Sequence, residues 1–278
     1  MSVLSIQSSV AAGHVGNSAA AFALQRLGIP VWRIDTVVFS NHPAYGDHKG
    51  RVVPTADLAA LLDGLAARDL WPHCRGILSG YLGDAGTGPL LAATVAAIRQ
   101  QSPKALYLCD PVIGDAGDIY VGNAVVDFYR SKGMVAADIV TPNAFEAAHL
   151  TGLRTNTVAG AVSAARALRR DPSQIVVVTG IKTAEATHTI ALDGRSAWQV
   201  TTPTVDGPSY GAGDLFAALL LGHLLGGADL RDALARSVSS VHGVLTGPRG
   251  ALDKDIALVP EQACLAEPPQ LFPATILA

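Results

Sequence analysis

The chain has 278 residues, of which 49% are hydrophobic and 15% are charged, and its formal net charge is −3. This composition can fill a substantial core and excludes a largely disordered protein. The slightly acidic balance, without a basic run, argues against nucleic acid as a partner.

Short apolar runs that predict strands alternate with stretches that predict helices. The expected strands, in chain order, are 2–8, 31–40, 76–80, 105–111, 137–143 and 174–180. The expected helices between them are 18–27, 57–70, 88–101, 124–132 and 158–170. The pattern then changes, because residues 188–202 hold an Asp-Gly pair between two alternating runs, which predicts a hairpin. Two further helices are expected at 214–225 and 229–245.

Near-continuous hydrophobic strands that alternate with helices predict an α/β fold with a mainly parallel sheet covered on both faces. The chain has no composition break or internal repeat, so we expect one domain over residues 1–278. Ligands of such sheets bind beyond the carboxyl ends of the strands. The glycine-rich and acidic segments follow strands here, namely QSSVAAGHVGN, SGYLGDAGTG, CDPVIGD, TPNAFE and TGIKT. A ligand site at this edge of the sheet is therefore predicted.

No segment predicts membrane insertion or export. The longest uncharged run, residues 215–228, is short for a bilayer, and the N-terminus predicts a strand rather than a signal peptide. The three cysteines are far apart without a C-x-x-C pair, so buried thiols are expected rather than disulfides or a zinc site; they are Cys74, Cys109 and Cys264. We expect a cytoplasmic protein.

Familiar catalytic signatures are missing from the sequence. It contains no G-x-x-x-x-G-K-[ST], no G-x-G-x-x-G, no G-x-S-x-G and no H-E-x-x-H. Instead, acids follow the predicted strands, and the set comprises Asp110, Asp115, Glu146 and Asp214. Carboxylates that share a cleft repel one another unless a cation offsets them, and Mg²⁺ prefers such oxygen ligands.

Each of these positions also has a structural interpretation. Asp110 suits a turn that ends a strand, Glu146 suits the first turn of a helix, and Asn143 suits a helix N-cap. Asp214 stands in the stretch VDGPSYGAGDLFAALLLGHLL, residues 205–225, just before the uncharged run. Taken alone, it fits either helix capping or a catalytic base placed where backbone N–H groups bind an anion.

Several long motifs carry a family resemblance. GAGDLFAALLL resembles the signature of the ribokinase-like superfamily of ATP-dependent small-molecule kinases, and CDPVIGD and TPNAFEAAHL resemble its vitamin-kinase branch. LSIQSSVAAGHVGNSAAAFALQRLG, TVVFSNHPAYG and SGYLGD narrow the similarity to the pyridoxal kinases. The matches run in order from about residue 3 to about residue 250. The resemblance implies a ribokinase-like three-layer α/β/α sandwich.

The resemblance also implies roles for individual residues. Asp214 accepts the proton of the substrate's hydroxymethyl group during attack on the γ-phosphorus of ATP, without needing a raised pKa. Backbone N–H groups around Gly211, Ala212 and Gly213 stabilise the transferred phosphoryl group, and Asp110 and Glu146 hold Mg²⁺. The residues implied at the nucleotide are Asp110, Asp115, Thr141, Asn143, Glu146, Thr179, Asp206, Gly207, Pro208 and Ser209. Those implied at the vitamin are Ser8, Val15, His42, Pro43, Ala44, Tyr81 and Asp214.

The implied cofactors are ATP and Mg²⁺, with a monovalent cation such as K⁺ as a further candidate, and the implied assembly is a homodimer. One position departs from the pattern, since Pro43 stands where relatives commonly have threonine. Proline has no hydroxyl and no N–H, so a substrate contact is missing or replaced there, which affects vitamer preference more than reaction type. His42 either lines the pocket or caps a turn, Ser8 either bonds the ring or belongs to a turn, and Lys182 suits a solvated loop.

Two other functions compete with pyridoxal phosphorylation. A hydroxymethylpyrimidine kinase of the same superfamily acts on a similar heterocyclic alcohol, but QSSVAAGHVGN and SNHPAYG favour pyridoxal. A non-catalytic vitamin B6 carrier on the same fold would not need the base Asp214 together with Gly213 and Glu146.

Overall fold

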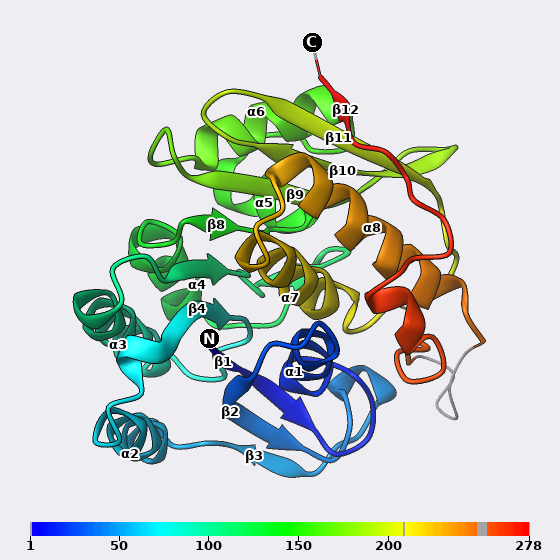
Figure 1. Ribbon diagram of the computed structural model, residues 1–278. Coiled ribbons are helices and arrows are strands. Elements are labelled where there is room, and N and C mark those ends of the chain that lie inside the picture. Colours follow the sequence, from blue (N-terminus) through cyan, green and yellow to red (C-terminus); the bar gives the residue numbers. More distant parts are fainter. Residues whose placement is uncertain (1, 208, 249–254, 278) are drawn as a thin grey trace.

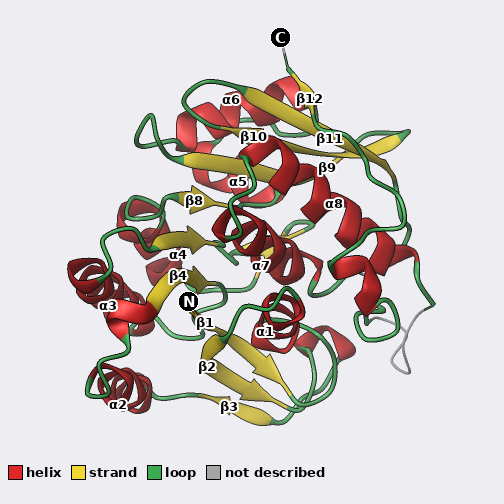
Figure 2. Ribbon diagram, viewed as in Figure 1, coloured by secondary structure: helices red, strands yellow, loops and turns green. Residues whose placement is uncertain are grey.

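A ten-stranded sheet with helices on both faces forms the frame of the protein (Figures 1 and 2). The computed structural model describes residues 2–207, 209–248 and 255–277. The parallel strands are β1 (Ser2–Val10), β2 (Val31–Phe39), β4 (Cys74–Ser79), β5 (Leu106–Cys109), β8 (Ile139–Val140) and β9 (Ile175–Lys182). The antiparallel strands are β3 (Gly50–Val52), β10 (Ala186–Leu192), β11 (Ala197–Pro203) and β12 (Thr275–Ile276). Their order is β12-β11-β10-β9-β8-β5-β4-β1-β2-β3.

Two hydrophobic cores lie on opposite faces of this sheet. In β9, Val176 and Val178 belong to one core, and Val177 between them belongs to the other. Because side chains of a strand alternate between faces, a run of β-branched residues fills both cores at once. One core is covered by α1 (Asn17–Arg26), α7 (Ala212–Leu225) and α8 (Leu230–Thr246). The other is covered by α2 (Thr55–Ala66), α3 (Thr87–Gln101), α4 (Asn123–Phe128), α5 (Ala144–Thr151) and α6 (Val158–Leu168).

Helix α7 explains the long uncharged run of the sequence. Every residue from Leu215 to Gly222 is buried, and the helix packs beside α1 and α8 on the sheet (Figure 1). A helix that is hydrophobic on all sides is stable only when it is enclosed by protein. Among the described residues, no helix combines the length and the apolar character needed to cross a membrane.

The predicted α/β architecture is confirmed, and so is the hairpin that β10 and β11 form. The expected helix at 124–132 is confirmed as helical, but only α4 as far as Phe128 is α-helical, and a π-helical turn, Tyr129–Gly133, follows. That turn places the fully buried Tyr129 so that its hydroxyl donates to the carbonyl of Gly80 at 2.7 Å. Helix α7 also begins two residues before Asp214, at Ala212.

Several smaller elements have no signal in the sequence. The two-stranded sheet of β6 (Gly114–Asp115) and β7 (Asp118–Ile119) is too short to show a hydrophobic alternation. The C-terminal segment adds β12 to β11, and the buried Phe272 donates its N–H to Ser239 Oγ at 2.8 Å. The three cysteines are free and buried, as expected.

Candidate active site

At β1, the direction in which successive strands are added to the sheet changes. From β1 the chain proceeds to β2 on one side, and the later strands β4, β5, β8 and β9 follow on the other side. Open α/β sheets bind ligands in the crevice at the carboxyl ends of the strands beside such a reversal. Ser8 lies near the carboxyl end of β1, and Tyr81 follows the end of β4. The predicted substrate residues therefore flank the crevice.

Asp214 is the third residue of α7, and its carboxylate contacts a distant loop. Its Oδ2 accepts a hydrogen bond from the N–H of Gly16 at 2.8 Å. The N-cap of α7 is Gly211, with φ of 87° and no side-chain cap. The capping interpretation of Asp214 is therefore wrong, because the carboxylate bonds β1–α1 backbone and not the N–H groups of its own helix. Burial raises the pKa of Asp214 to about 6, although the Gly16 hydrogen bond opposes this.

Two glycines make this approach of α7 to the β1–α1 loop possible. Gly16 has φ of 55°, and a Cβ there would collide with the carbonyl and the hydroxyl of Ser8. Gly211 has φ of 87°, and a Cβ there would collide with the carbonyl of His14 and lie 3.4 Å from Val15 Cα. Both positions therefore require glycine for backbone conformation and for space. Ser8 thus lies against Gly16, which bonds Asp214, and Val15 lies against Gly211, at the turn that leads to Asp214.

Asp110 faces the start of α7 from the end of β5. Its Oδ1 accepts from Thr141 Oγ1 at 2.8 Å, and a Cβ on Gly213 would lie 3.9 Å from its Oδ2. Burial and the nearby charge of Asp214 raise the pKa of Asp110, while the Thr141 hydroxyl opposes the shift. The structure thus brings together Asp110, Thr141, Gly213 and Asp214, which lie far apart in the sequence.

Glu146 is held almost entirely by backbone N–H groups. Its Oε1 accepts from Ile113 and Gly114 at 2.8 and 3.3 Å, and its Oε2 accepts from Asn143 at 2.9 Å. Asn143 is the N-cap of α5 and accepts in return from the N–H of Glu146 at 2.8 Å. The capping interpretations of both residues are confirmed. Burial and the negative charge of Asp110 raise the pKa of Glu146, so this carboxylate also lies in the acidic cluster.

Within residues 2–207, 209–248 and 255–277, no ion pair joins a basic side chain to Asp110, Glu146 or Asp214. The ion pairs among the described residues join other groups, and no set of three possible metal-ligating side chains occurs there. Mg²⁺ characteristically takes one or two carboxylates and completes its shell with water and phosphate oxygens. Two buried carboxylates with raised pKa values therefore fit Mg²⁺ that arrives with a nucleotide, and they do not form an all-protein metal cage.

The turn after β2 supplies the other predicted substrate residues. Pro43, Ala44 and Tyr45 form a 3₁₀ turn, with His42 as its N-cap. His42 Nδ1 accepts from the N–H of Ala44 at 3.2 Å, so the capping interpretation of His42 is confirmed. The His42 ring also stacks on Tyr210 at 4.6 Å, which places the turn beside the loop that precedes α7.

The remaining predicted residues are less closely connected. The backbone of Thr179, within β9, forms a parallel bridge with Asn143, which lies beyond the carboxyl end of β8. Asp115 is exposed, and its carboxylate accepts from the N–H of Ala116 at 2.8 Å. Of the predicted nucleotide loop, Asp206, Gly207 and Ser209 are exposed, and Pro208 lies outside the described residues. Lys182 is exposed at the end of β9, as expected.

The amides at the start of α7 are unequally placed for an anion. The N–H of Ala212 donates to the carbonyl of Ser209 at 3.0 Å, so it is already engaged. Gly213 is exposed and faces Asp110. Of these two amides, that of Gly213 is therefore the better placed to meet a phosphate.

Sequence reasoning did not single out Gly16, Tyr210 or Asp255. Gly16 provides the N–H that Asp214 accepts, and its only signal is the glycine-rich stretch AAGHVGN after the first strand. Tyr210 and Asp255 contact the 3₁₀ turn, and nothing in the local sequence marks those contacts.

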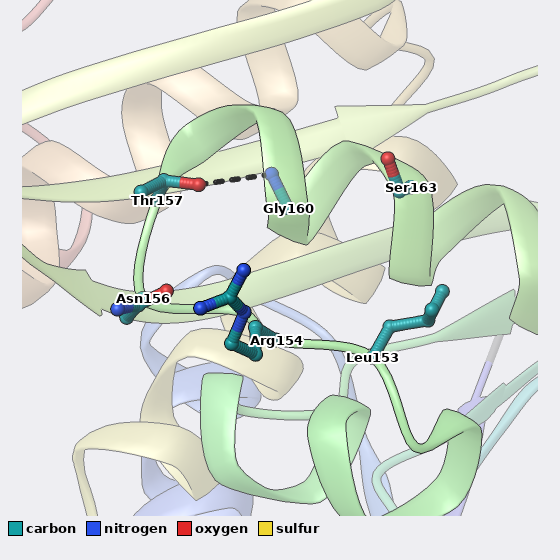
Figure 3. A pocket seen from close by; sticks show the side chains of 6 residues that line it. All are labelled: Leu153, Arg154, Asn156, Thr157, Gly160 and Ser163. Atoms are coloured by element: carbon teal, nitrogen blue, oxygen red, sulfur yellow. Dashed lines mark hydrogen bonds between the residues drawn. The ribbon is translucent and has the colours of Figure 1, made fainter.

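Two open cavities lie elsewhere on the molecule. One, of about 380 Å³, lies between α5 and α6 and is lined by Leu153, Arg154, Asn156, Thr157, Gly160 and Ser163 (Figure 3). The other, of about 410 Å³, lies near the end of α7, around His223 and Arg236. Neither is lined by a predicted site residue. In the first, Thr157 serves as the N-cap of α6.

Known proteins resemble the chain over its whole length. A family model described as phosphomethylpyrimidine kinase matches residues 80–253. Pyridoxal kinase PdxY of Rubrobacter xylanophilus is 43% identical over 100% of this chain and 98% of its own length. Pyridoxal kinase PdxY of Deinococcus radiodurans is 42% identical over 98% of this chain and 95% of its own length. The chain belongs to the pyridoxal kinase family.

Solved structures of this pyridoxal kinase family share the fold closely. A pyridoxal kinase from Leishmania donovani in complex with ADP and pyridoxamine has a TM-score of 0.92 and 29% identity, with 99% of both chains covered. One from Entamoeba histolytica has a TM-score of 0.92 and 26% identity, again with 99% of both chains covered. The ribokinase-like fold expected from the motifs is therefore confirmed.

Proposed function

We propose that this chain transfers the γ-phosphoryl group of ATP to the 5'-hydroxymethyl group of pyridoxal, and also of pyridoxine and pyridoxamine. The observation that carries the proposal is the carboxylate of Asp214, held by Gly16 in the crevice at the carboxyl ends of the strands. The family membership supports it, because the full-length relatives are pyridoxal kinases. The Leishmania donovani enzyme carries ADP together with pyridoxamine or pyridoxine.

In the proposed reaction, the hydroxymethyl oxygen attacks the γ-phosphorus and its proton passes to Asp214 Oδ. A bond forms between that oxygen and phosphorus, the bond from phosphorus to the β,γ-bridging oxygen breaks, and ADP leaves. A carboxylate with a pKa of about 6 is mostly ionised at neutral pH and can accept the proton late. The N–H of Gly213, at the positive end of α7, would face the charge on the transferred group.

Asp110 and Glu146 are the proposed Mg²⁺ residues. Mg²⁺ would neutralise charge on the β- and γ-phosphates when bound. Glu146 already accepts three backbone N–H groups, so Asp110 Oδ2 is the better placed direct ligand, and Glu146 would act through water. The raised pKa values of both carboxylates support a cation there, because burial and a neighbouring carboxylate both disfavour the ionised forms and a cation would offset this.

The remaining assignments are also proposals. The vitamin ring would lie between Val15 and Tyr81, with Ser8 at its polar edge and the His42–Ala44 turn as a wall. The nucleotide would contact Thr179, Asn143, Asp115 and the loop that includes Asp206, Gly207 and Ser209. We propose further that residues 1–278 act as one domain in a cytoplasmic homodimer, with K⁺ as a candidate activator.

The range of the pyrimidine-kinase family model bears on specificity. The model begins at residue 80, so it includes Asp110, Glu146 and Asp214 but not Ser8 or the His42–Ala44 turn. The matched range therefore covers the proposed phosphoryl-transfer residues. Ser8, Val15 and the His42–Ala44 turn lie before residue 80, in the part that the pyridoxal kinase relatives match and the family model does not.

One assay tests the proposed function. Purified protein is incubated with Mg²⁺-ATP and either pyridoxal or hydroxymethylpyrimidine, and ADP and pyridoxal 5'-phosphate are measured together. We expect stoichiometric ADP and pyridoxal phosphate with pyridoxal, at a kcat/KM well above that for the pyrimidine. Preference for the pyrimidine would replace the assignment with a pyrimidine kinase. Pyridoxal binding without ADP release would indicate a carrier.

A further inference from the structure

The 3₁₀ turn that carries the proposed vitamin contacts lies on the surface of the protein. None of its residues, Pro43 to Tyr45, is buried, and Pro43 and Ala44 are exposed. A surface turn without buried apolar side chains depends strongly on its polar and ring contacts for its position. Those contacts therefore determine where the wall of the vitamin site stands.

One of these contacts comes from a residue near the C-terminal end of the chain. Tyr45 Oη donates to Asp255 Oδ1 at 2.6 Å, and both residues are partly buried. Hydrogen bonds of this length from a hydroxyl to a carboxylate are charge-assisted and among the stronger ones in proteins. Asp255 lies beyond α8, so the bond joins segments 210 residues apart.

Asp255 also touches the loops around the base. Its backbone forms a parallel bridge with Tyr210, the residue before the N-cap of α7, and the Tyr210 ring stacks on His42 at 4.6 Å. A Cβ on Gly13 would lie 3.0 Å from Asp255 Oδ1, so the carboxylate also rests against the β1–α1 loop. Three loops of the crevice thus meet at Asp255.

We propose that Asp255 is a positioning residue for the vitamin: through Tyr45 and Tyr210 it fixes the His42–Tyr45 turn as a wall of the site beside Asp214. This inference rests on the proposed function, since it assumes that the turn faces pyridoxal. Asp255 itself does not contact the reacting atoms. Its loss should therefore weaken binding of the vitamin and leave the nucleotide side of the site unchanged.

The test compares Asp255→Leu, Asp255→Asn, Tyr45→Phe and the double variant Tyr45→Phe/Asp255→Leu with the wild type. Leucine and phenylalanine remove the hydrogen bond, whereas the asparagine carbonyl can still accept it. We expect Asp255→Leu and Tyr45→Phe each to raise KM for pyridoxal about tenfold, the loss that one hydrogen bond to a charged group predicts. KM for ATP should change by less than about twofold, and Asp255→Asn should restore most of the affinity.

The double variant and a matched control complete the design. Because both changes break one bond, the double variant should be no worse than Asp255→Leu. Asp47→Ala removes an exposed carboxylate from the same loop and should leave both KM values unchanged. A wild-type KM for pyridoxal in Asp255→Leu, an equal rise of KM for ATP, or additive effects in the double variant would each overturn the proposal.

Failure of the proposed function gives a different result. If the wild type forms no pyridoxal phosphate, the kinase assignment fails. Calorimetric titration of pyridoxal into the same variants then still decides whether Asp255 positions a vitamin wall. A thermal melt of each variant identifies one that does not fold, and in that case Tyr45→Phe alone provides the comparison.

Discussion

Replacing Asp214 with asparagine would remove the proposed base and keep the local structure. The side chain retains its size, and its amide oxygen can still accept from the N–H of Gly16, as the carboxylate does at 2.8 Å. General-base catalysis contributes roughly 10²–10⁴-fold, so kcat should fall by about that range. Binding of ATP, measured by titration, should persist.

The pH dependence provides a second readout of the same residue. Burial raises the pKa of Asp214 to about 6, and the base works only when it is ionised. In the wild type, kcat/KM should therefore be full above that pH and fall about tenfold per unit below it. The residual activity of Asp214→Asn should lack this inflection.

Asp57→Asn is the matched control, because Asp57 occupies the same third position in α2 but is exposed. Both changes remove an acid from the positive end of a helix, which costs about 0.3–1 kcal/mol of stability. Only the Asp214 change should affect turnover. If Asp214→Asn kept most of the wild-type kcat, the catalytic assignment would be refuted and Asp214 would serve only to hold the β1–α1 loop.

Two further predictions concern the metal and the vitamer. Glu146→Gln should weaken the apparent Mg²⁺ affinity more than it weakens pyridoxal binding. Glu267→Gln is the control, because Glu267 is exposed. Equal Mg²⁺ titration curves for Glu146→Gln and the wild type would contradict the role of Glu146. Pro43→Thr should sharpen the preference among pyridoxal, pyridoxine and pyridoxamine, by about the 0.5–1.5 kcal/mol of one hydrogen bond. Unchanged ratios of kcat/KM for the three vitamers would mean that the side chain at position 43 does not face the substrate.

The sequence predicts those features that depend on local pattern. The enclosed helix α7 follows from its uncharged run, and the mainly parallel sheet follows from strands that are hydrophobic on both faces. The acids at strand ends also follow, since parallel strands bring their carboxyl ends to one edge. Asp110, Thr141 and Gly213 could thus be expected to meet before their distances were known.

Long-range contacts could not be predicted in the same way. The bond between Gly16 and Asp214 spans 198 residues, and the bond between Tyr45 and Asp255 spans 210. Neither has a periodicity or a spacing that local reasoning can use. The π-helical turn after α4 is similar, because it depends on where Tyr129 meets the carbonyl of Gly80.

The Gly16 contact can be tested with a pair of alanine substitutions. Gly16 and Gly28 both have positive φ, of 55° and 77°, so alanine is strained at either position. At Gly28 a Cβ would meet nothing within 4 Å, whereas at Gly16 it would collide with Ser8. Gly28→Ala should therefore cost about 1–2 kcal/mol of stability and leave kcat/KM unchanged.

Gly16→Ala must in addition displace the N–H that Asp214 accepts. Because that hydrogen bond lowers the pKa of Asp214 against the effect of burial, its loss should move the inflection of kcat/KM to a pH above about 6. Activity at neutral pH should fall with it, and it should fall much less when Asp214 is already asparagine. If Gly16→Ala remained folded and matched Gly28→Ala in its pH profile, the N–H of Gly16 would have no part in tuning the base.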